Sequence, residues 1–481
     1  MTSVRALACC ALAASLCACS VGPPYVAPQP PATNAYTARP APALPEQQLQ
    51  PGASVAPRWW ESFGSPALDR METQALARNP ALESAQHTLR QARYDLVAAE
   101  GIFYPQVALS ASGERIRSSG AESGGHIGPN LYNLYTGQVS VSYYPDAFGL
   151  NRLVAEDAQA QVDVAHDQLL AAQLAIEGNV ASTVFALASL EARIAAIRQT
   201  IADQQEILDL VRTQYRAGAV SGLQIATQES QLASAQAELP VLEQARDQAH
   251  HLLATYLGEA PAQAGDLEAP QIAALTLPPA LPLSVPASLV HQRPDILAAE
   301  AQLRAANARL GEAVARMYPQ LVLTGDFGAQ SNEASKFLDP ASRIWDLAAA
   351  ALAPVFNGGT LKAQKNAAEE AYGALFANYR STVLAAFRDV ADALRALEHD
   401  AAALEAQKRA LDAADTAFGL ARSQYQAGAV GYLGLLVSEV QLQNARVAYV
   451  GAQAQRFSDS AALYVALGGG VAAPGASREE K

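Results

Sequence analysis

An internal duplication constrains the fold of this 481-residue chain more than any other feature of its sequence. The word QYRAGAV at residues 214–220 recurs as QYQAGAV at residues 424–430, an offset of 210. In the same order, LATYLG at 253–258 matches LYVALG at 463–468, and YPQ at 104–106 returns at 318–320. Several matching words in one order indicate two structural repeats, so both halves should fold on the same plan.

Each repeat should contain a very long helical hairpin. Apolar residues step by three and four positions without a break in the first repeat, at Leu187, Leu190, Ile194, Ile197, Ile201, Leu208 and Val211, ending at Tyr215, with Gln204 also in register. The second repeat continues the heptad at Leu397, Leu404, Leu411, Phe418 and Tyr425. A 3.5-residue apolar period of this length predicts left-handed coiled coils, and a helix over 150–216 would be ~100 Å long. Gly218 and Gly428 mark the turns, return helices should begin near Leu223 and Leu433, and Pro240 should kink the first of them.

Two alternating segments precede the hairpin in each repeat. They follow predicted helices over 80–101 and 294–314. In the first repeat the apolar positions are Val107, Leu109 and Ala111 in one segment and Val139, Val141 and Tyr143 in the other. In the second repeat they are Leu321, Leu323 and Phe327, and then the weaker set Trp345, Leu347 and Ala349. Serines, Thr324 and Asp326 occupy the opposite parity, which is typical of strands whose two faces meet different solvents. The connections 118–133 and 331–342 are rich in Gly, Ser, Asn and Asp, as hairpin loops are.

The N-terminal segment predicts export and a lipid anchor. All four cysteines, Cys9, Cys10, Cys17 and Cys19, lie in a segment with Arg5 and an apolar run typical of a signal peptide. Leu16-Cys17-Ala18-Cys19 resembles a bacterial lipobox, in which Cys19 would receive the lipid; the alternative is an ordinary cleaved signal with incidental cysteines. Ser20 after the cysteine favours the outer membrane, and the proline-rich stretch 21–57 reads as an extended strap.

The net charge of the chain and the small number of its predicted strands limit the functions that it can have. The formal net charge of −13 and the lack of any Lys/Arg block exclude a nucleic-acid binder. No stretch after the signal reaches the ~18 uninterrupted apolar residues of a spanning helix, so a membrane crossing must use strands. Four strands are too few to close a barrel, because single-chain outer-membrane barrels begin at about eight, and open sheet edges in lipid leave backbone groups unsatisfied. The chain should therefore oligomerise around a shared barrel that continues as a helical tube.

Several further words resemble one known family. They are CSVGPPY at 19–25, WWESF at 59–63, LPLSVP at 281–286, QRPDI at 292–296, PVFNGG at 354–359, and DSAAL at 459–463 leading to ALGGG at 466–470. Together they resemble TolC-like outer-membrane factors of the NodT-type lipoprotein branch, the exit ducts of tripartite efflux pumps. The resemblance implies a mostly α fold with membrane β, a trimeric α/β-barrel to which each chain gives four strands and two coiled-coil hairpins. It also implies a homotrimer in outer-membrane lipid, with a periplasmic adaptor and an inner-membrane RND-type transporter as partners.

The expected domain order follows the repeats. We expect a signal peptide over 1–18, an anchor and strap over 19–58, a first repeat over 59–259, a connector over 260–286, a second repeat over 287–470 and a tail over 471–481.

The resemblance also implies sites at the hairpin tips, where the family docks its adaptor and constricts the duct. The docking candidates are Gly218, Ala219, Val220, Gly428, Ala429 and Val430, although the glycines also supply the freedom that a sharp turn requires. Some relatives place an Asp and an Arg after the second tip, where Val437 and Val440 stand here, so an ionic lock is not expected. The remaining gate candidates are Tyr215, Tyr425, Glu229 and Glu439. The two glutamates are equivalent under the duplication, and for each of them a solvated helix face is the favoured interpretation over a carboxylate in the lumen.

No enzymatic motif is evident. The adjacent pair His250-His251 points in two directions on a helix, and no phosphate loop or nucleophile elbow occurs, so we expect no catalysis, no cofactor and no metal. The expected function is a passive duct for drugs, aromatic compounds or metal ions. Alternatives are a type I protein-secretion duct, or a non-conducting lipid-anchored periplasmic coiled-coil spacer that would leave the alternating strands unexplained.

Overall fold

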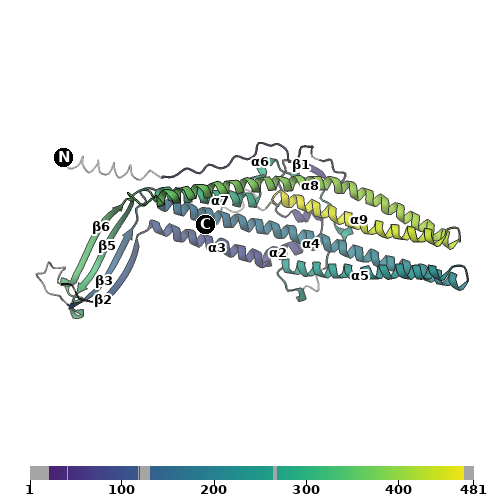
Figure 1. Cartoon of the computed structure of the whole chain (residues 1–481), viewed down its shortest axis with the longest axis horizontal. Helices are drawn as coiled ribbons and strands as arrows, with labels where there is room; N and C mark the ends of the chain where they lie inside the picture. Colours follow the sequence, from purple (N-terminus) through teal and green to yellow (C-terminus); the bar gives the residue numbers. More distant parts are fainter. Residues whose placement is uncertain (1–20, 41, 118, 120–130, 264–267, 471–481) are drawn as a thin grey trace. The chain divides into compact units, whose positions relative to one another are not determined.

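The computed structural model describes residues 21–40, 42–117, 119, 131–263 and 268–470 (Figure 1). The predicted signal peptide, Cys19 and the predicted tail after residue 470 lie outside the described residues. The chain divides into two compact units. The first takes in Met1–Pro28, Thr88–Ala165 and Ala298–Tyr379, and the second Gln29–His87, His166–Leu297 and Arg380–Lys481.

The first unit contains a four-stranded antiparallel sheet. Its strands are β2 (Gln106–Arg117), β3 (Leu131–Tyr143), β5 (Gln320–Ser331) and β6 (Arg343–Leu352), in the order β2-β3-β5-β6. Two short 3-10 turns, η5 (Ala334–Lys336) and η6 (Pro340–Ser342), connect β5 to β6. All four strands were predicted from the alternating pattern, and the register pairs the predicted apolar positions, such as Leu109 with Val139 and Phe327 with Trp345.

Helices lead into and out of this sheet. Each repeat enters it from a helix that begins at a proline, α3 (Pro80–Glu100) or α7 (Pro294–Ala315), and leaves it into a 67-residue helix, α4 (Leu150–Arg216) or α8 (Thr360–Gln426). A short 3-10 turn, η2 (Gly101–Phe103), lies between α3 and β2. The predicted helix bounds are confirmed within one or two residues. The helices can start at Pro80 and Pro294 because the first helical residue needs no backbone N–H donor.

The second unit contains most of the two helical hairpins, whose long helices α4 and α8 begin in the first unit and enter the second at His166 and Arg380. α4 returns as α5 (Gly222–Tyr256), and α8 returns as α9 (Tyr432–Ala466), both return helices being 35 residues long. Ile194, Ile197 and Leu242 form one buried seam between α4 and α5. α5 continues as helix through Pro240.

An aromatic core and short elements complete the second unit. The short elements are β1 (Gln48–Pro51) paired in parallel with β4 (Ala280–Leu283), α2 (Pro66–Arg78), α6 (Pro286–Leu289), and the 3-10 turns η1 (Trp59–Phe63), η3 (Pro261–Gln263) and η4 (Ile272–Ala274). Trp59 of the predicted WWESF word stacks on Tyr464 at 5.3 Å between ring centroids, and Phe63 meets Phe185 at 5.0 Å. These rings are buried, so the word is part of a core.

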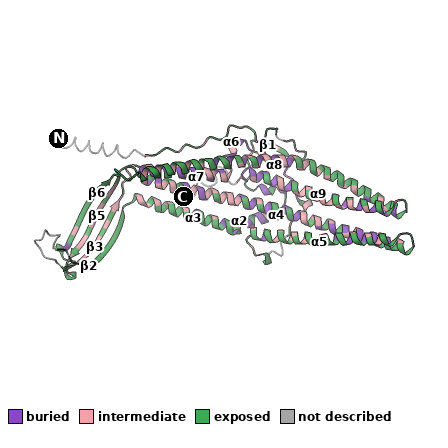
Figure 2. Cartoon of the chain, viewed as in Figure 1, coloured by how far each residue is buried: buried purple, intermediate pink, exposed green. Residues whose placement is uncertain are grey.

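Burial differs between helices and strands. Figure 2 shows the buried residues on the helices, whereas β2 is exposed along almost its whole length. Within the described residues, one 18-residue stretch of α4 is apolar enough to span a membrane by composition, and half of it is buried inside the protein. That burial is typical of a core helix.

Candidate functional site

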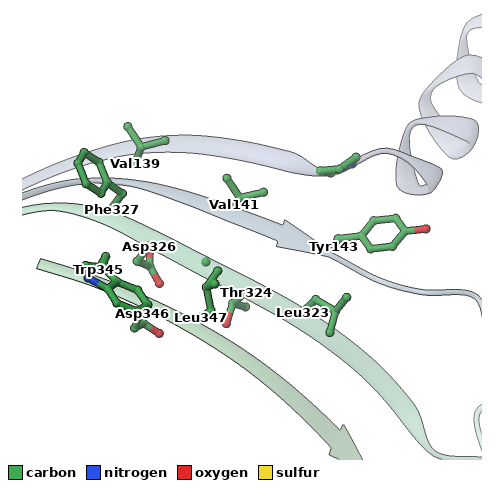
Figure 3. Close-up of a pocket in the computed structure, with 12 residues that line it drawn as sticks. Val139, Val141, Tyr143, Leu323, Thr324, Asp326, Phe327, Trp345, Asp346 and Leu347 are labelled. Atoms are coloured by element: carbon green, nitrogen blue, oxygen red, sulfur yellow. The ribbon is translucent and has the colours of Figure 1, made fainter. Parts of the chain in front are cut away.

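The odd-numbered face of the four-stranded sheet is apolar and exposed. Leu109 is 82% exposed, Trp345 72% and Leu347 80%, and Val107 and Phe327 are also largely open. Figure 3 shows residues of this face from β3, β5 and β6 where they line a shallow hollow of about 660 Å³. A soluble monomer rarely leaves so many large apolar side chains open on one surface. This face therefore has the character of a surface made for lipid.

Aromatic side chains form a layer near the end of the sheet that faces away from the helices. Phe327 lies directly across from Trp345, and the ring of Tyr135 packs over Gly113 on the neighbouring strand. At the helix-proximal end, Tyr104 and Tyr318 are both exposed next to the starts of β2 and β5. Aromatic girdles at both borders of an apolar band are typical of membrane-spanning strands.

The even-numbered face of the same sheet is polar. Asp326 accepts hydrogen bonds from Ser140 Oγ and, at 3.2 Å, from Gln138 Nε2. Asp326 also lies directly opposite Asp346 in the register. Two carboxylates facing each other destabilise a sheet unless water or a cation screens them, so this face is suited to an aqueous lumen.

The sheet has two open edges. In the described structure β2 pairs only with β3, and β6 pairs only with β5. Their outer backbone donors and acceptors need partners in a membrane. A further copy of the chain can supply them by placing its own β2 against β6.

Both hairpin tips are Schellman turns. In the first tip Ala219 N donates to Gln214 O at 2.9 Å and Gly218 N to Tyr215 O at 2.9 Å; in the second, Ala429 N donates to Gln424 O at 2.8 Å and Gly428 N to Tyr425 O at 3.0 Å. Gly218 has φ +74° and Gly428 φ +72°, the left-handed conformation that this motif needs. Gly218, Ala219, Gly428 and Ala429 are exposed, while Val220 and Val430 are half-buried.

The two hairpins pack against each other near their tips. Ile207, Val211, Phe418, Tyr425, Tyr432, Leu435 and Leu442 form one buried cluster from α4, α8 and α9. Tyr425 donates its hydroxyl proton to Gln214 Oε1 at 2.6 Å, and Tyr432 donates to Gln228 Oε1 at 2.7 Å. Two tyrosine–glutamine bonds therefore join the second hairpin to the first.

The two equivalent glutamates have different environments. Glu229 is exposed and pairs with Arg212 at 2.7 Å, as a solvated face predicts. Glu439 is only 4% exposed, so the solvated-face interpretation is wrong for this residue. Burial, with the like charge of Asp203, raises the pKa of Glu439 to about 7, while the Gln204 side chain lowers it. The difference arises because α9 packs on the other hairpin at this position.

The other gate candidates also differ between the repeats. Tyr425 is 6% exposed, whereas its equivalent Tyr215 is 49% exposed. Val437 is 47% exposed and Val440 is half-buried. Tyr425 was a candidate from its sequence position, whereas Tyr432, Gln214 and Gln228 were not. Gln214 is the first residue of the repeated QYxAGAV word, so the duplication could have indicated it as a candidate. No sequence pattern indicates Gln228 or Tyr432.

The start of the proline-rich strap is held by polar contacts. In the first unit Asn307 Nδ2 donates to Pro23 O at 3.0 Å, and Tyr25 donates to Glu300 Oε1 at 3.3 Å. In the second unit Tyr36 donates to Ser284 O at 2.9 Å, and Arg395 Nη2 to Thr37 Oγ1 at 2.7 Å. The strap is thus tied down on both sides of Pro28. Across the described ranges, no group of three or more His, Cys, Asp or Glu side chains is arranged to hold a metal ion.

Comparison with known proteins identifies the class that this geometry defines. The chain belongs to the outer membrane efflux protein family, whose sequence pattern matches residues 73–259 and 285–469. It is 32% identical to the pyoverdine export outer membrane protein OpmQ of Pseudomonas putida over 491 aligned residues, covering 99% of this chain and 100% of OpmQ. It is 28% identical to the probable outer membrane lipoprotein SilC of Salmonella typhimurium, covering 95% of each.

Solved structures show the same fold. The outer-membrane channel OprN superposes with a TM-score of 0.87 at 26% identity, over 94% of this chain and 100% of OprN. VceC from Vibrio cholerae gives a TM-score of 0.81 at 27% identity, over 87% of this chain and 100% of VceC. The predicted family, TolC-like fold class and outer-membrane location are confirmed. The chain is an outer-membrane efflux channel subunit, and its family is one of channels and not of enzymes.

Proposed function

We propose that three copies of the chain close a twelve-stranded barrel in the outer membrane and carry small molecules through its lumen as a passive duct. The observation that carries the proposal is the sheet itself, which has one apolar exposed face, one polar face and two open edges. A single chain leaves the edge groups of β2 and β6 unpaired in lipid, and closure of the barrel satisfies both.

The anchor and partners complete this proposal. Cys19 carries the lipid, and the polar contacts of residues 23–25 hold the chain that follows it against the first unit. The exposed tips at Gly218, Ala219, Gly428 and Ala429 dock a periplasmic adaptor, to which an RND-type inner-membrane transporter supplies the energy. Drugs, aromatic compounds or metal ions are the proposed cargo.

The tyrosine bonds between the hairpins form the proposed gate. Tyr425 and Tyr432 hold the second hairpin against the first through Gln214 and Gln228. The duct opens when these contacts and the buried cluster around them separate. Ion pairs of Arg422 with Glu206, and of Arg446 with Asp203 at 3.3 Å, also join the two hairpins, so the ionic contacts between them lie on residues other than Val437 and Val440.

Planar-bilayer recording tests the proposal. The purified protein should form discrete channels, and native mass spectrometry of the same sample should give a mass of three chains. A stable monomer on an electrically silent membrane would contradict the proposal and favour the non-conducting spacer. Disruption of the encoding gene should raise sensitivity to small toxic compounds; loss of a secreted protein instead would favour the type I secretion duct.

A further inference from the structure

Charge in the membrane sheet is divided between its two faces. Every acidic residue of the four described strands, Glu114, Asp326 and Asp346, has an even number and lies on the polar face. Every basic residue, Arg115, Arg117 and Arg343, has an odd number and lies on the apolar face. The arginines therefore share the face that is directed at lipid, where a charged side chain is destabilising unless it lies near the membrane interface.

All three arginines lie at the same end of the sheet, away from the helices. Arg115 pairs with Asn133 and Arg117 with Leu131 in the β2–β3 register, and Arg343 pairs with Ala329 in the β5–β6 register. The connections β2–β3 and β5–β6 leave the sheet at this end. The helices continue into the periplasm in the proposed assembly, so this end faces the cell exterior.

The height of the arginines matches the border of the outer leaflet. Arg117 is ten residues beyond Val107, or ~33 Å along the strand, and at a tilt of about 40° this length spans the ~25 Å height of an apolar band. Tyr135, Phe327 and Trp345 lie just below the arginines on the same face. The order along the strands is apolar, then aromatic, then cationic, which follows the order of hydrocarbon, interface and headgroup in a bilayer.

The arginines are available for a ligand. Each is exposed, and no described residue forms an ion pair or side-chain hydrogen bond with Arg115, Arg117 or Arg343. Lys336, in the β5–β6 connection, is already paired with Glu333 at 2.7 Å. Among the described residues, the arginine charges are thus left without counter-charges on their own face.

Barrel closure brings the three arginines together. Arg343 begins β6 at one edge of the sheet, and Arg115 and Arg117 end β2 at the other. When β6 of one chain pairs with β2 of the next, as the proposed function requires, Arg343 of one copy joins Arg115 and Arg117 of its neighbour. Each junction between chains then presents three guanidinium groups on the outer rim.

We propose that this arginine rim binds the phosphate groups of a phosphorylated lipid of the outer leaflet. Guanidinium groups bind phosphate in a bidentate manner and suit a planar, charged contact better than ammonium groups do. The rim continues directly into the apolar face, so the acyl chains of the same lipid lie against Leu109, Phe327 and Trp345. A soluble anion would use the arginines but not this apolar surface. The bound lipid seals the junction between neighbouring chains.

Lipid titration of the purified trimer tests the proposal. The probe is lipid A with two phosphates in detergent micelles, and the bound lipid is counted by native mass spectrometry. Because each cation near a charged membrane surface contributes about 1 kcal/mol, R343Q should weaken binding by roughly fivefold and R115Q/R117Q/R343Q by more than tenfold. The matched control R90Q/R93Q/R152Q removes the same charge from exposed helix positions and should bind as the wild type does.

Three results would overturn the proposal. They are unchanged affinity in R343Q and in the triple variant, equal binding of phosphate-free lipid A, or competition by inorganic phosphate at concentrations matching the lipid. Channel conductance and trimer mass are recorded on the same samples. If the triple variant conducts as a trimer and still binds the lipid, the proposed lipid site is contradicted and the proposed duct is not. If the wild type forms no trimer, the proposed function itself is contradicted.

Discussion

Glu72 and Glu177 are fully buried in the second unit, and no basic side chain in the described part of the chain pairs with either of them. Glu177 accepts hydrogen bonds from Trp59 Nε1 at 3.2 Å and Gln173 Nε2 at 2.9 Å. Burial raises the pKa of Glu177 to about 7, and burial with the nearby Glu177 charge raises the pKa of Glu72 well above its ordinary value. A buried carboxylate without a counter-charge is costly, so this pair retains protons that exposed glutamates release.

The pair makes stability depend on pH, because the folded chain holds protons that the unfolded chain loses above pH 4.5. Stability conferred by Glu177 is complete below pH 4.5 and is lost as pH rises to about 7. Glu177→Gln keeps a hydrogen-bond acceptor and removes the charge, so it should stabilise each chain by roughly 2–3 kcal/mol at pH 8 and change little at pH 4. Thermal unfolding at both pH values measures this. Glu83→Gln, at an exposed glutamate, is the control, and equal pH slopes in the wild type and Glu177→Gln would contradict the prediction.

At the scale of elements, the hairpin tips depend on backbone conformation. Gly218→Ala and Gly428→Ala place a side chain at a positive φ angle, which should cost about 1 kcal/mol at each tip. Hydrogen exchange of the tip amides should accelerate accordingly. Gly222→Ala lies in α5 with open space around it and no positive φ, so it should leave exchange unchanged or slow it. If hydrogen exchange of the tip amides accelerates only in Gly222→Ala, the left-handed conformation of Gly218 and Gly428 is not what limits local opening of the tips.

The duplication supplies a control for the gate between the hairpins. Tyr425→Phe removes the hydrogen bond to Gln214, a net contribution of about 1 kcal/mol, so the ratio of open to closed channels should rise roughly fivefold. Tyr215→Phe changes the equivalent, half-exposed residue of the first repeat and should leave the ratio unchanged. Single-channel open probability measures both. A gate that responds equally to the two substitutions would not involve the Tyr425 bond.

The sequence was sufficient to predict elements but not their partners. Helix bounds followed from Pro80, Pro294 and the glycine turns, and strand faces followed from the alternation, because these patterns are local. Contacts between distant segments were not readable: Glu439 and Glu229 look equivalent under the duplication, yet only Glu439 is buried. The packing of one hairpin on the other gives such equivalent residues different environments, and no local sequence pattern predicts this packing. The lipid on Cys19, the docking and gate residues, and the domain boundaries remain predictions.

At the scale of the whole molecule, the proposed closure of the barrel turns the two faces of one sheet into the outside and the inside of a duct. The rule that places each strand residue is parity, since neighbouring residues point to opposite faces. One rule therefore assigns the apolar band to lipid and Asp326, Asp346 and Glu114 to the lumen. The described strands place no basic residue on that inner face, so the negative charge there is not neutralised within the sheet.

This charge predicts that the duct prefers cations. Carboxylates lining a pore attract cations and repel anions, so the wild-type reversal potential in a salt gradient should have the cation-selective sign. Asp326→Asn with Asp346→Asn should lower the cation-to-anion permeability ratio by at least about twofold. The control is Glu333→Gln with Asp339→Asn, which removes two acidic charges from the β5–β6 connection outside the strands. An anion-selective wild type, or an equal change in the control, would mean that the even-numbered face does not line the lumen, and the assignment of both faces would then be reversed.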